Sequence, residues 1–284
     1  MILNPLTYHR PASLEEALVL LRELPDAKFL AGGTMLINRL KTAKRSGLKT
    51  PQNLISLKGI SELKGIQDEG EAGLCIKSMT TLSEVIQHPN PGCLSFLTAF
   101  QSICSLIGTT QIRNMGTIGG NLASRYTWTE LGAVLMTLNA SLYFQDPEGQ
   151  ERVSSAEKFF RDGARISGIL TRIRIPRMPD TRMCYFRKPR VSEVDIPLMA
   201  VCAQARIKEA RFQELRITVN RGTLFPQRCS DLETALTGAV AEADTVAAIV
   251  SGIDPESIDP QCDEYKRHMY HIAIRDAILG LLKE

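Results

Sequence analysis

Two short stretches place a pair of glycines where an apolar segment passes into one with helical spacing. Residues 29–40 read FLAGGTMLINRL, and residues 115–123 read MGTIGGNLA. Paired glycines leave backbone N–H groups unobstructed at the start of a helix, where the helix dipole favours an anion. Each pair is followed by a polar residue, Thr34 or Asn121. Together the two loops predict a site that holds the two ends of a diphosphate.

Simpler and competing interpretations of these loops exist. A plain turn needs only one glycine and a capping residue, so two ordinary turns are the alternative to a phosphate site. Neither loop has the GxGxxG spacing of a Rossmann fold or the GxxxxGKS/T spacing of a P-loop. Those two nucleotide-binding folds are therefore disfavoured.

The first glycine pair is predicted to lie inside a compact β-α-β unit. Ser13 begins a capping box with Glu16 and so starts a short amphipathic helix. We expect a buried strand at Lys28–Ala31, a helix at Thr34–Lys44 and a second strand at Asn53–Leu57. These elements predict a first subdomain over residues 1–57.

A second subdomain is predicted for residues 58–176. The turn at residues 146–149, Asp-Pro-Glu-Gly, separates two strand patterns and indicates a hairpin. The segment ILTRIRI (169–175) alternates apolar and basic residues, which predicts one buried and one solvated face. Pro176 and Pro179 then break the pattern. Further elements are expected at Leu74–Ser78 (strand), Leu82–Gln87 (helix), Leu94–Ile107 (helix) and Asn139–Gln145 (strand).

The remaining residues, 177–284, predict a separate α+β domain, because strand patterns come first and helical patterns follow. Strands are expected at Ile196–Ile207 and Phe212–Asn220, and helices near Asp231–Leu236, Ala241–Val250 and Asp263–Leu282.

Composition favours an ordinary globular protein. The 284 residues are 44% hydrophobic and 23% charged with a net charge of +3, which gives no reason to propose nucleic acid as a partner. Basic residues gather in 161–190; a solvated strand edge is the favoured interpretation and an anionic ligand the alternative. Residues 1–12 lack a secretion signal, and the most apolar later stretch, 131–144, is too short to cross a bilayer. We therefore expect a cytoplasmic location without membrane contact.

No metal site is predicted. The seven cysteines are scattered without a CxxC pair, which argues against a disulfide framework, a zinc site or a cluster made by this chain alone. His268 and His271 lack a third ligand in register and are expected at the surface. The cysteines are Cys75, Cys93, Cys104, Cys184, Cys202, Cys229 and Cys262.

Beyond these patterns, the chain closely resembles a known family. LAGGTMLI (30–37) and QIRNMGTIGGNLA (111–123), at this separation, are similar to the flavin-binding subunit or domain of the molybdenum hydroxylases, which include xanthine dehydrogenase and carbon monoxide dehydrogenase. The resemblance runs along nearly the whole chain, through FRKPRVSEVDI (186–196) to EYKRHM (264–269). It implies the two-subdomain FAD-binding fold of the PCMH type, followed by the smaller α+β domain.

The resemblance also implies which residues hold FAD. The two glycine loops would wrap around its diphosphate through backbone amides and hydroxyls, Glu130 would hold ribityl or ribose hydroxyls, and Arg187 would lie near the flavin. The implied FAD-binding residues are Phe29, Leu30, Ala31, Gly32, Gly33, Thr34, Met35, Leu36, Ile107, Thr117, Ile118, Gly119, Gly120, Asn121, Glu130, Leu170 and Arg187.

Three positions depart from the family pattern. Met35 stands where the first loop usually carries an acidic residue, and Arg187 stands where a lysine is usual. The segment 126–130, Tyr-Thr-Trp-Thr-Glu, replaces a common Ser-Pro-x-x-Asp. Trp128 within it is expected to be a core or rim aromatic, with stacking on a nucleotide ring as the alternative.

The resemblance implies an electron-transfer flavoprotein subunit. Electrons from a molybdenum centre would reach FAD through [2Fe-2S] clusters and leave to NAD⁺ or another acceptor, with the flavin itself as the redox centre and no catalytic side chain. The clusters and the molybdenum cofactor would belong to partner chains, an iron–sulfur subunit and a molybdenum-cofactor subunit, in a hetero-oligomer. Two alternatives stay open: a stand-alone FAD-dependent oxidoreductase, or a scaffold subunit that has lost FAD.

Overall fold

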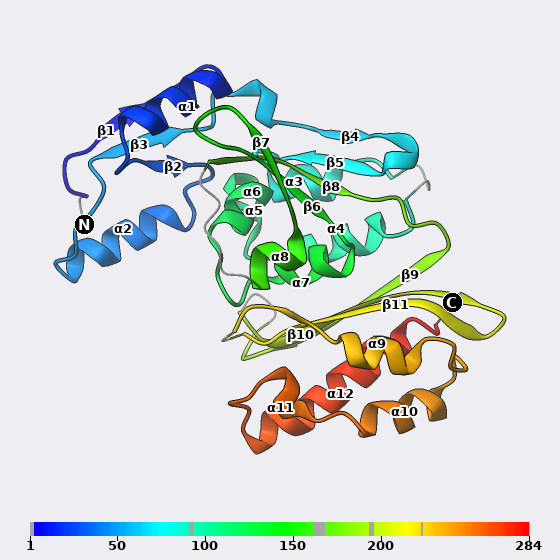
Figure 1. Cartoon of the computed structure of the whole chain (residues 1–284). Coiled ribbons are helices and arrows are strands. Elements are labelled where there is room, and N and C mark those ends of the chain that lie inside the picture. Colours follow the sequence, from blue (N-terminus) through cyan, green and yellow to red (C-terminus); the bar gives the residue numbers. More distant parts are fainter. Residues whose placement is uncertain (1–2, 91–93, 162–167, 193–195, 223, 284) are drawn as a thin grey trace.

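The computed structural model describes residues 3–90, 94–161, 168–192, 196–222 and 224–283. Within these ranges the strands form three sheets, which follow one another along the chain. Figure 1 shows the third sheet between the helices of the second part and the last helices of the chain. The described helices include none that is long and apolar enough to cross a membrane.

The first sheet is parallel and belongs to the predicted β-α-β unit. Its strands lie in the order β1 (Thr7–His9), β3 (Asn53–Ser56) and β2 (Lys28–Leu30). Helix α1 (Leu14–Glu23) precedes β2, and helix α2 (Leu36–Arg45) follows it. The two predicted strands and the two predicted helices are present, although each strand ends one residue earlier and α2 begins two residues later and ends one residue later than expected. Strand β1 has no counterpart among the predicted elements.

The predicted capping box at the start of α1 forms only in part. The Ser13 hydroxyl accepts from the Glu16 amide at 3.1 Å. The Glu16 carboxylate reaches back to the Ala12 amide at 2.8 Å, one residue earlier than in the standard motif. One unpaired amide of the first helical turn, that of Glu16, is thereby satisfied, and the Glu16 side chain ties the helix to the residue before its N-cap.

The second sheet is antiparallel, in the order β4-β5-β8-β6-β7. The predicted hairpin is confirmed, because the Asp146 amide donates to the Gln150 carbonyl at 3.0 Å across the turn. The strands are β4 (Ile66–Asp68), β5 (Leu74–Lys77), β6 (Ser141–Gln145), β7 (Glu151–Ser155) and β8 (Ile169–Ile175).

Strand β8 has the predicted wet face. The Arg172 guanidinium lies 2.8 Å from the Glu151 carboxylate, and that of Arg174 lies 2.7 Å from Glu69. These basic side chains therefore have acidic partners within the chain. The expected edge strand is wrong for this segment, because β8 pairs with β5 on one side and with β6 on the other and is the central strand of the sheet.

Short helices cover the second sheet. One of them, α7 (Glu130–Thr137), is buried at every residue, so its surroundings enclose it on all sides. The others are α3 (Leu82–Gln87), α4 (Leu97–Ser105), α5 (Thr110–Met115), α6 (Ile118–Ala123) and α8 (Ala156–Arg161), with single 3₁₀ turns at Ser61–Leu63 and Gly70–Ala72. Helix α3 matches its predicted bounds, whereas α4 is shorter than the predicted 94–107.

The third sheet is antiparallel and is covered on both faces. Met199 and Val201 of β10 belong to the core formed with α12 (Glu264–Gly280), whereas Cys202 of β10 belongs to the core that includes α7 residues. The strands lie in the order β12 (Gln227–Arg228), β11 (Arg211–Asn220), β10 (Pro197–Lys208) and β9 (Thr181–Pro189). Helices α9 (Ser230–Leu236), α10 (Ala243–Ser251) and α11 (Pro255–Ile258) complete the chain together with α12.

The sequence patterns miss β9. Seven consecutive residues of this strand, Met183–Pro189, are half-buried, so no alternation of buried and exposed residues marks it. The predicted boundaries after residues 57 and 176 fall between the three sheets. The division into two subdomains and a C-terminal domain remains a prediction.

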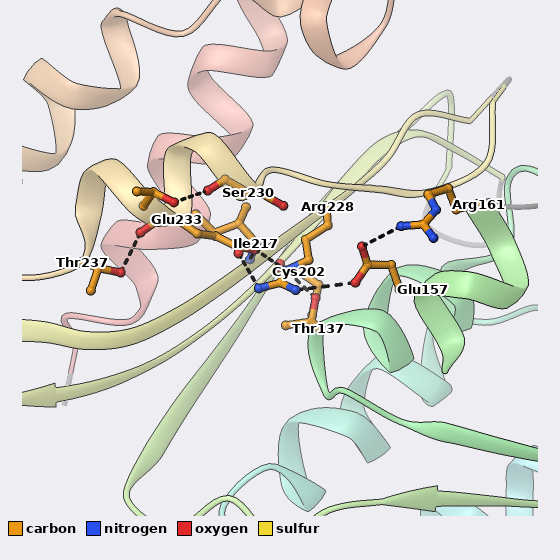
Figure 2. Close-up of polar contacts among 10 residues, drawn as sticks. Thr137, Glu157, Arg161, Cys202, Ile217, Arg228, Ser230, Glu233 and Thr237 are labelled. Atoms are coloured by element: carbon orange, nitrogen blue, oxygen red, sulfur yellow. Dashed lines mark hydrogen bonds and ion pairs between the residues drawn. The ribbon is translucent and has the colours of Figure 1, made fainter. Parts of the chain in front are cut away.

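A polar network joins the third sheet to the second part (Figure 2). Buried Glu233 on α9 accepts from the Ile217 amide at 2.8 Å and from the Arg228 guanidinium at 2.6 Å. Arg228 also reaches Glu157 on α8 at 3.5 Å. The Thr137 hydroxyl of α7 donates to the Cys202 carbonyl at 3.3 Å. These contacts fix β10, β11 and β12 against α7 and α8.

We predict that Glu233→Ala lowers the free energy of unfolding by about 3 kcal/mol, because it leaves a buried amide and a guanidinium without their acceptor. The matched control is Glu214→Ala, which removes the partner of Arg206 in a pair where Glu214 is 68% exposed. That change is expected to cost less than about 1 kcal/mol. Urea unfolding followed by circular dichroism measures both, and equal losses would contradict the prediction.

Candidate functional site

A cavity of about 520 Å³ lies where the three parts of the chain meet. Its wall includes Phe29 from the first part, Ile107 from the second and Arg187 from the third. The structure brings together, in this wall, all of the residues expected to bind FAD except two: Phe29, Ala31, Gly32, Gly33, Thr34, Met35, Leu36, Ile107, Thr117, Gly119, Gly120, Asn121, Glu130, Leu170 and Arg187.

Leu30 and Ile118 are absent from the cavity wall. Ile118 is fully buried and belongs to the core of the second part. The Leu30 side chain lies behind the first loop, 3.2 Å from the position that a Cβ on Gly33 would occupy. Both residues are apolar neighbours of the glycine loops. Their side chains pack on the side of the loops that faces away from the cavity.

The first glycine loop offers a row of unused donors. Among the described residues, no acceptor pairs with the backbone amides of Gly32, Gly33, Thr34 and Met35. These four residues line the cavity and precede α2, and Gly33 has a φ of +78°. Consecutive free amides at a helix start form a concave nest for an anion. This loop therefore has the chemistry that the sequence predicted.

The second glycine loop differs from the prediction. The Gly119 amide donates to the Ser78 carbonyl at 2.9 Å, and the Gly120 amide donates to the Thr117 hydroxyl at 3.0 Å. The Asn121 amide donates to the Thr117 carbonyl at 2.9 Å. Thr117 is thus the N-cap of α6, and the amides after it are satisfied inside the protein. What this loop presents to the cavity is a wall and the Asn121 side chain, whose Oδ1 accepts from the Thr129 hydroxyl.

Two of the glycines are required by the chain itself. A Cβ on Gly32 would lie 2.0 Å from the Met115 carbonyl oxygen, and one on Gly119 would lie 2.6 Å from the Ser78 Cβ. Such distances exclude any side chain without backbone movement. The expected role of these glycines was to make room for a ligand, whereas here neighbouring segments of the chain pack into that room.

A buried ion pair closes another part of the wall. The Glu130 Oε1 accepts from Arg187 Nε at 2.8 Å, and the two side chains are 6% and 8% exposed. The Tyr185 hydroxyl donates to the same oxygen at 2.7 Å. Burial raises the pKa of Glu130, while the Tyr185 hydrogen bond and the Arg187 charge oppose that rise. The pair joins the start of α7 to β9.

Aromatic residues stack beside this pair. The rings of Tyr126 and Trp128 lie 4.5 Å apart between centroids, and the Arg39 guanidinium lies 5.7 Å from the Tyr126 centroid. All three residues line the cavity. Trp128 is half-buried at the cavity wall, a position that fits both a rim aromatic and stacking on a nucleotide ring.

Sequence reasoning missed several residues of the wall. Arg39 lies on α2, one turn after the glycine loop, and helical spacing could have placed it there. Ser78 also lines the cavity, and its Oγ is buried without a hydrogen-bond partner among the described residues. No sequence pattern marks Ser78, because its position follows from packing against Gly119.

Within the described ranges, no group of three or more His, Cys, Asp or Glu side chains is arranged to hold a metal ion. His268 is exposed, whereas His271 is half-buried with Nε2 3.0 Å from the Ile253 carbonyl. The cavity is therefore a site for an organic, partly anionic ligand: free amides, an ion pair, aromatic rings and apolar walls.

Comparison with known proteins identifies the family. Residues 4–178 match the family model described as the FAD binding domain in molybdopterin dehydrogenase. The chain is 30% identical to the carbon monoxide dehydrogenase medium chain of Afipia carboxidovorans, over 98% of this chain and 97% of that protein. It is 26% identical to the putative xanthine dehydrogenase FAD-binding subunit of Escherichia coli (strain K12), over 96% and 94%.

A solved structure gives the same result. The crystal structure of the Cu,Mo-CO dehydrogenase in its cyanide-inactivated form contains a chain that superimposes with a TM-score of 0.86 at 28% identity, covering 99% of each chain. The resemblance seen in the glycine loops is confirmed over the full length of the fold. The chain belongs to the family of FAD-binding subunits of the molybdenum hydroxylases.

Proposed function

We propose that this chain is the FAD-carrying electron-transfer subunit of a multi-subunit molybdenum hydroxylase, and that its FAD lies in the cavity shared by the three parts. The observation that carries the proposal is the run of four free amides at Gly32–Met35, which face a cavity without a protein acceptor among the described residues. A diphosphate satisfies such a row of donors better than water does.

The residues present fit FAD. The amides of the first loop would hold the diphosphate, and the orphan Ser78 hydroxyl would gain a partner. Ile107 and Leu170 supply apolar wall for a ring. Glu130 offers a carboxylate oxygen for a hydroxyl. When bound, FAD supplies the redox chemistry, accepting electrons and passing them on.

Arg187 has a distinct role in this proposal. Its guanidinium is fixed by Glu130 and buried in the cavity wall, so it stays charged and cannot turn away. A fixed cation stabilises negative charge that develops beside it in a water-poor site. We propose that Arg187 thereby favours the reduced, anionic state of the adjoining ring.

Electron donors and acceptors belong to other molecules in this proposal. Two relatives are named as medium chains or FAD-binding subunits of carbon monoxide and xanthine dehydrogenases, which supports assembly with other chains. We propose an iron–sulfur subunit and a molybdenum-cofactor subunit as partners in a cytoplasmic hetero-oligomer. The final acceptor is NAD⁺ or another oxidant, and anaerobic titration of the FAD-loaded chain with NADH decides between them by bleaching, or failing to bleach, the flavin bands.

We predict that the purified chain is yellow and carries one FAD. The measurement is a visible absorption spectrum of the native protein, followed by heat release and identification of the cofactor in the supernatant. Twin flavin bands and free FAD are the expected result. A colourless chain that also fails to take up added FAD would reject the proposal and favour a scaffold subunit.

A second prediction tests the diphosphate position. Thr34→Asp is expected to weaken FAD binding on the order of a hundredfold relative to Thr34→Asn, because the Asp charge repels a diphosphate held by the neighbouring amides. The two variants have the same size, and Thr34 makes no side-chain hydrogen bond with the described residues and has no positive φ. Fluorescence titration of the apo-protein measures both affinities, and equal values would place the diphosphate elsewhere.

A further inference from the structure

Tyr185 lies behind the cavity wall, where it touches Glu130 without lining the cavity. It stands in β9 opposite Cys202 of β10, and it packs against the core of the second part. Its hydroxyl donates to Glu130 Oε1 at 2.7 Å. Burial and the neighbouring Glu130 charge raise the pKa of Tyr185 well above its ordinary value, so it remains a neutral donor.

Strand geometry brings Tyr185 and Arg187 to the same carboxylate oxygen. Residues two apart on a strand share a face, and both side chains therefore project from β9 toward the start of α7. Arg187 Nε donates to Glu130 Oε1 at 2.8 Å. One oxygen thus receives two donors, whereas Glu130 Oε2 accepts no hydrogen bond from any described residue. Glu130 itself lines the cavity.

Two buried thiols also lie near the Glu130–Tyr185 contact. Cys104 on α4 also faces Glu130, and burial raises the pKa of its thiol well above the ordinary value. Burial raises the pKa of Cys202 on β10, beside Tyr185, to about 12. Both thiols are neutral at ordinary pH. Burial raises the pKa of Glu130, whereas the hydrogen bond from Tyr185 and the charge and hydrogen bond of Arg187 lower it, so the two donors favour the ionised carboxylate.

From this arrangement we propose that Tyr185 is a positioning residue: it ties Glu130 Oε1 to the wall so that Oε2 faces the cavity as the acceptor for a hydroxyl of the bound cofactor. The inference rests on the proposed function, since it assigns that acceptor to the FAD. A two-point hold on one oxygen fixes the rotation of the carboxylate, which a single ion pair leaves free. The third sheet thus contributes to binding through a residue outside the cavity.

The test measures the dissociation constant of FAD for the full-length apo-protein across pH. Tyr185→Phe is expected to raise this constant about tenfold near neutral pH, the effect of one hydrogen bond to a charged group. Losing the hydroxyl also removes an influence that lowers the pKa of Glu130. In the variant the carboxylate therefore protonates at a higher pH, and affinity falls earlier as the solution is acidified.

The matched control is Tyr270→Phe. Tyr270 is buried, whereas Tyr185 is half-buried, and like Tyr185 it donates to a buried carboxylate, that of Asp259, at 3.1 Å. It lies in the core of the C-terminal helices, outside the cavity wall. Its loss is expected to leave both the FAD affinity and its pH profile unchanged. The control therefore distinguishes the effect of weakened packing in the C-terminal residues from the effect of losing the hydrogen bond to Glu130.

Other outcomes overturn the inference. An unchanged affinity in Tyr185→Phe, or a loss that is equal at every pH, would show that Tyr185 serves packing alone. Should this variant fail to fold, Glu130→Gln tests the same carboxylate: a flattened pH profile is expected, and the wild-type profile would refute the role of Glu130. Wild-type chain that binds no FAD would instead reject the proposed function.

Discussion

The structure depends on a close contact between backbone segments at the two glycine loops. A Cβ at Gly32 would overlap the Met115 carbonyl, and one at Gly119 would overlap Ser78. The first loop leaves its amides without an acceptor among the described residues, whereas the second loop satisfies its amides through Ser78, directly after β5, and through its own N-cap Thr117. The result is an asymmetric site, in which one loop donates hydrogen bonds and the other supplies the surface behind them.

Much of the fold follows from local sequence. The Ser13 N-cap, the turn at residues 146–149 and the alternation in β8 each specify their element through a few neighbouring residues, and each of these three predictions is confirmed. The glycine loops identify the family, because their composition is constrained both by the site and by packing. The sequence therefore predicts a structural element well where the residues that determine it lie within a few positions of one another.

The rest was out of reach because its causes lie far away in the chain. Strand β9 has no burial alternation, since one face packs on α12 and the other on the core of the second part. The role of Tyr185 depends on its hydrogen bond to Glu130, which lies more than fifty residues earlier in the chain. The sequence suggests that the amides of Gly119 and Gly120 lack hydrogen-bond acceptors. In the folded chain, however, they donate to the Ser78 carbonyl and the Thr117 hydroxyl.

The stack of Arg39, Tyr126 and Trp128 has a spectroscopic consequence. Trp128 is the sole tryptophan of the chain, and it lines the cavity in contact with Tyr126. Emission excited selectively from tryptophan therefore originates at one place, the rim where the three parts meet. Neither α10 nor the β6–β7 hairpin lines the cavity, so this emission is expected to respond to separation of the three parts and not to local unfolding of those elements. The protein thus carries an intrinsic optical reporter of whether its cavity is assembled.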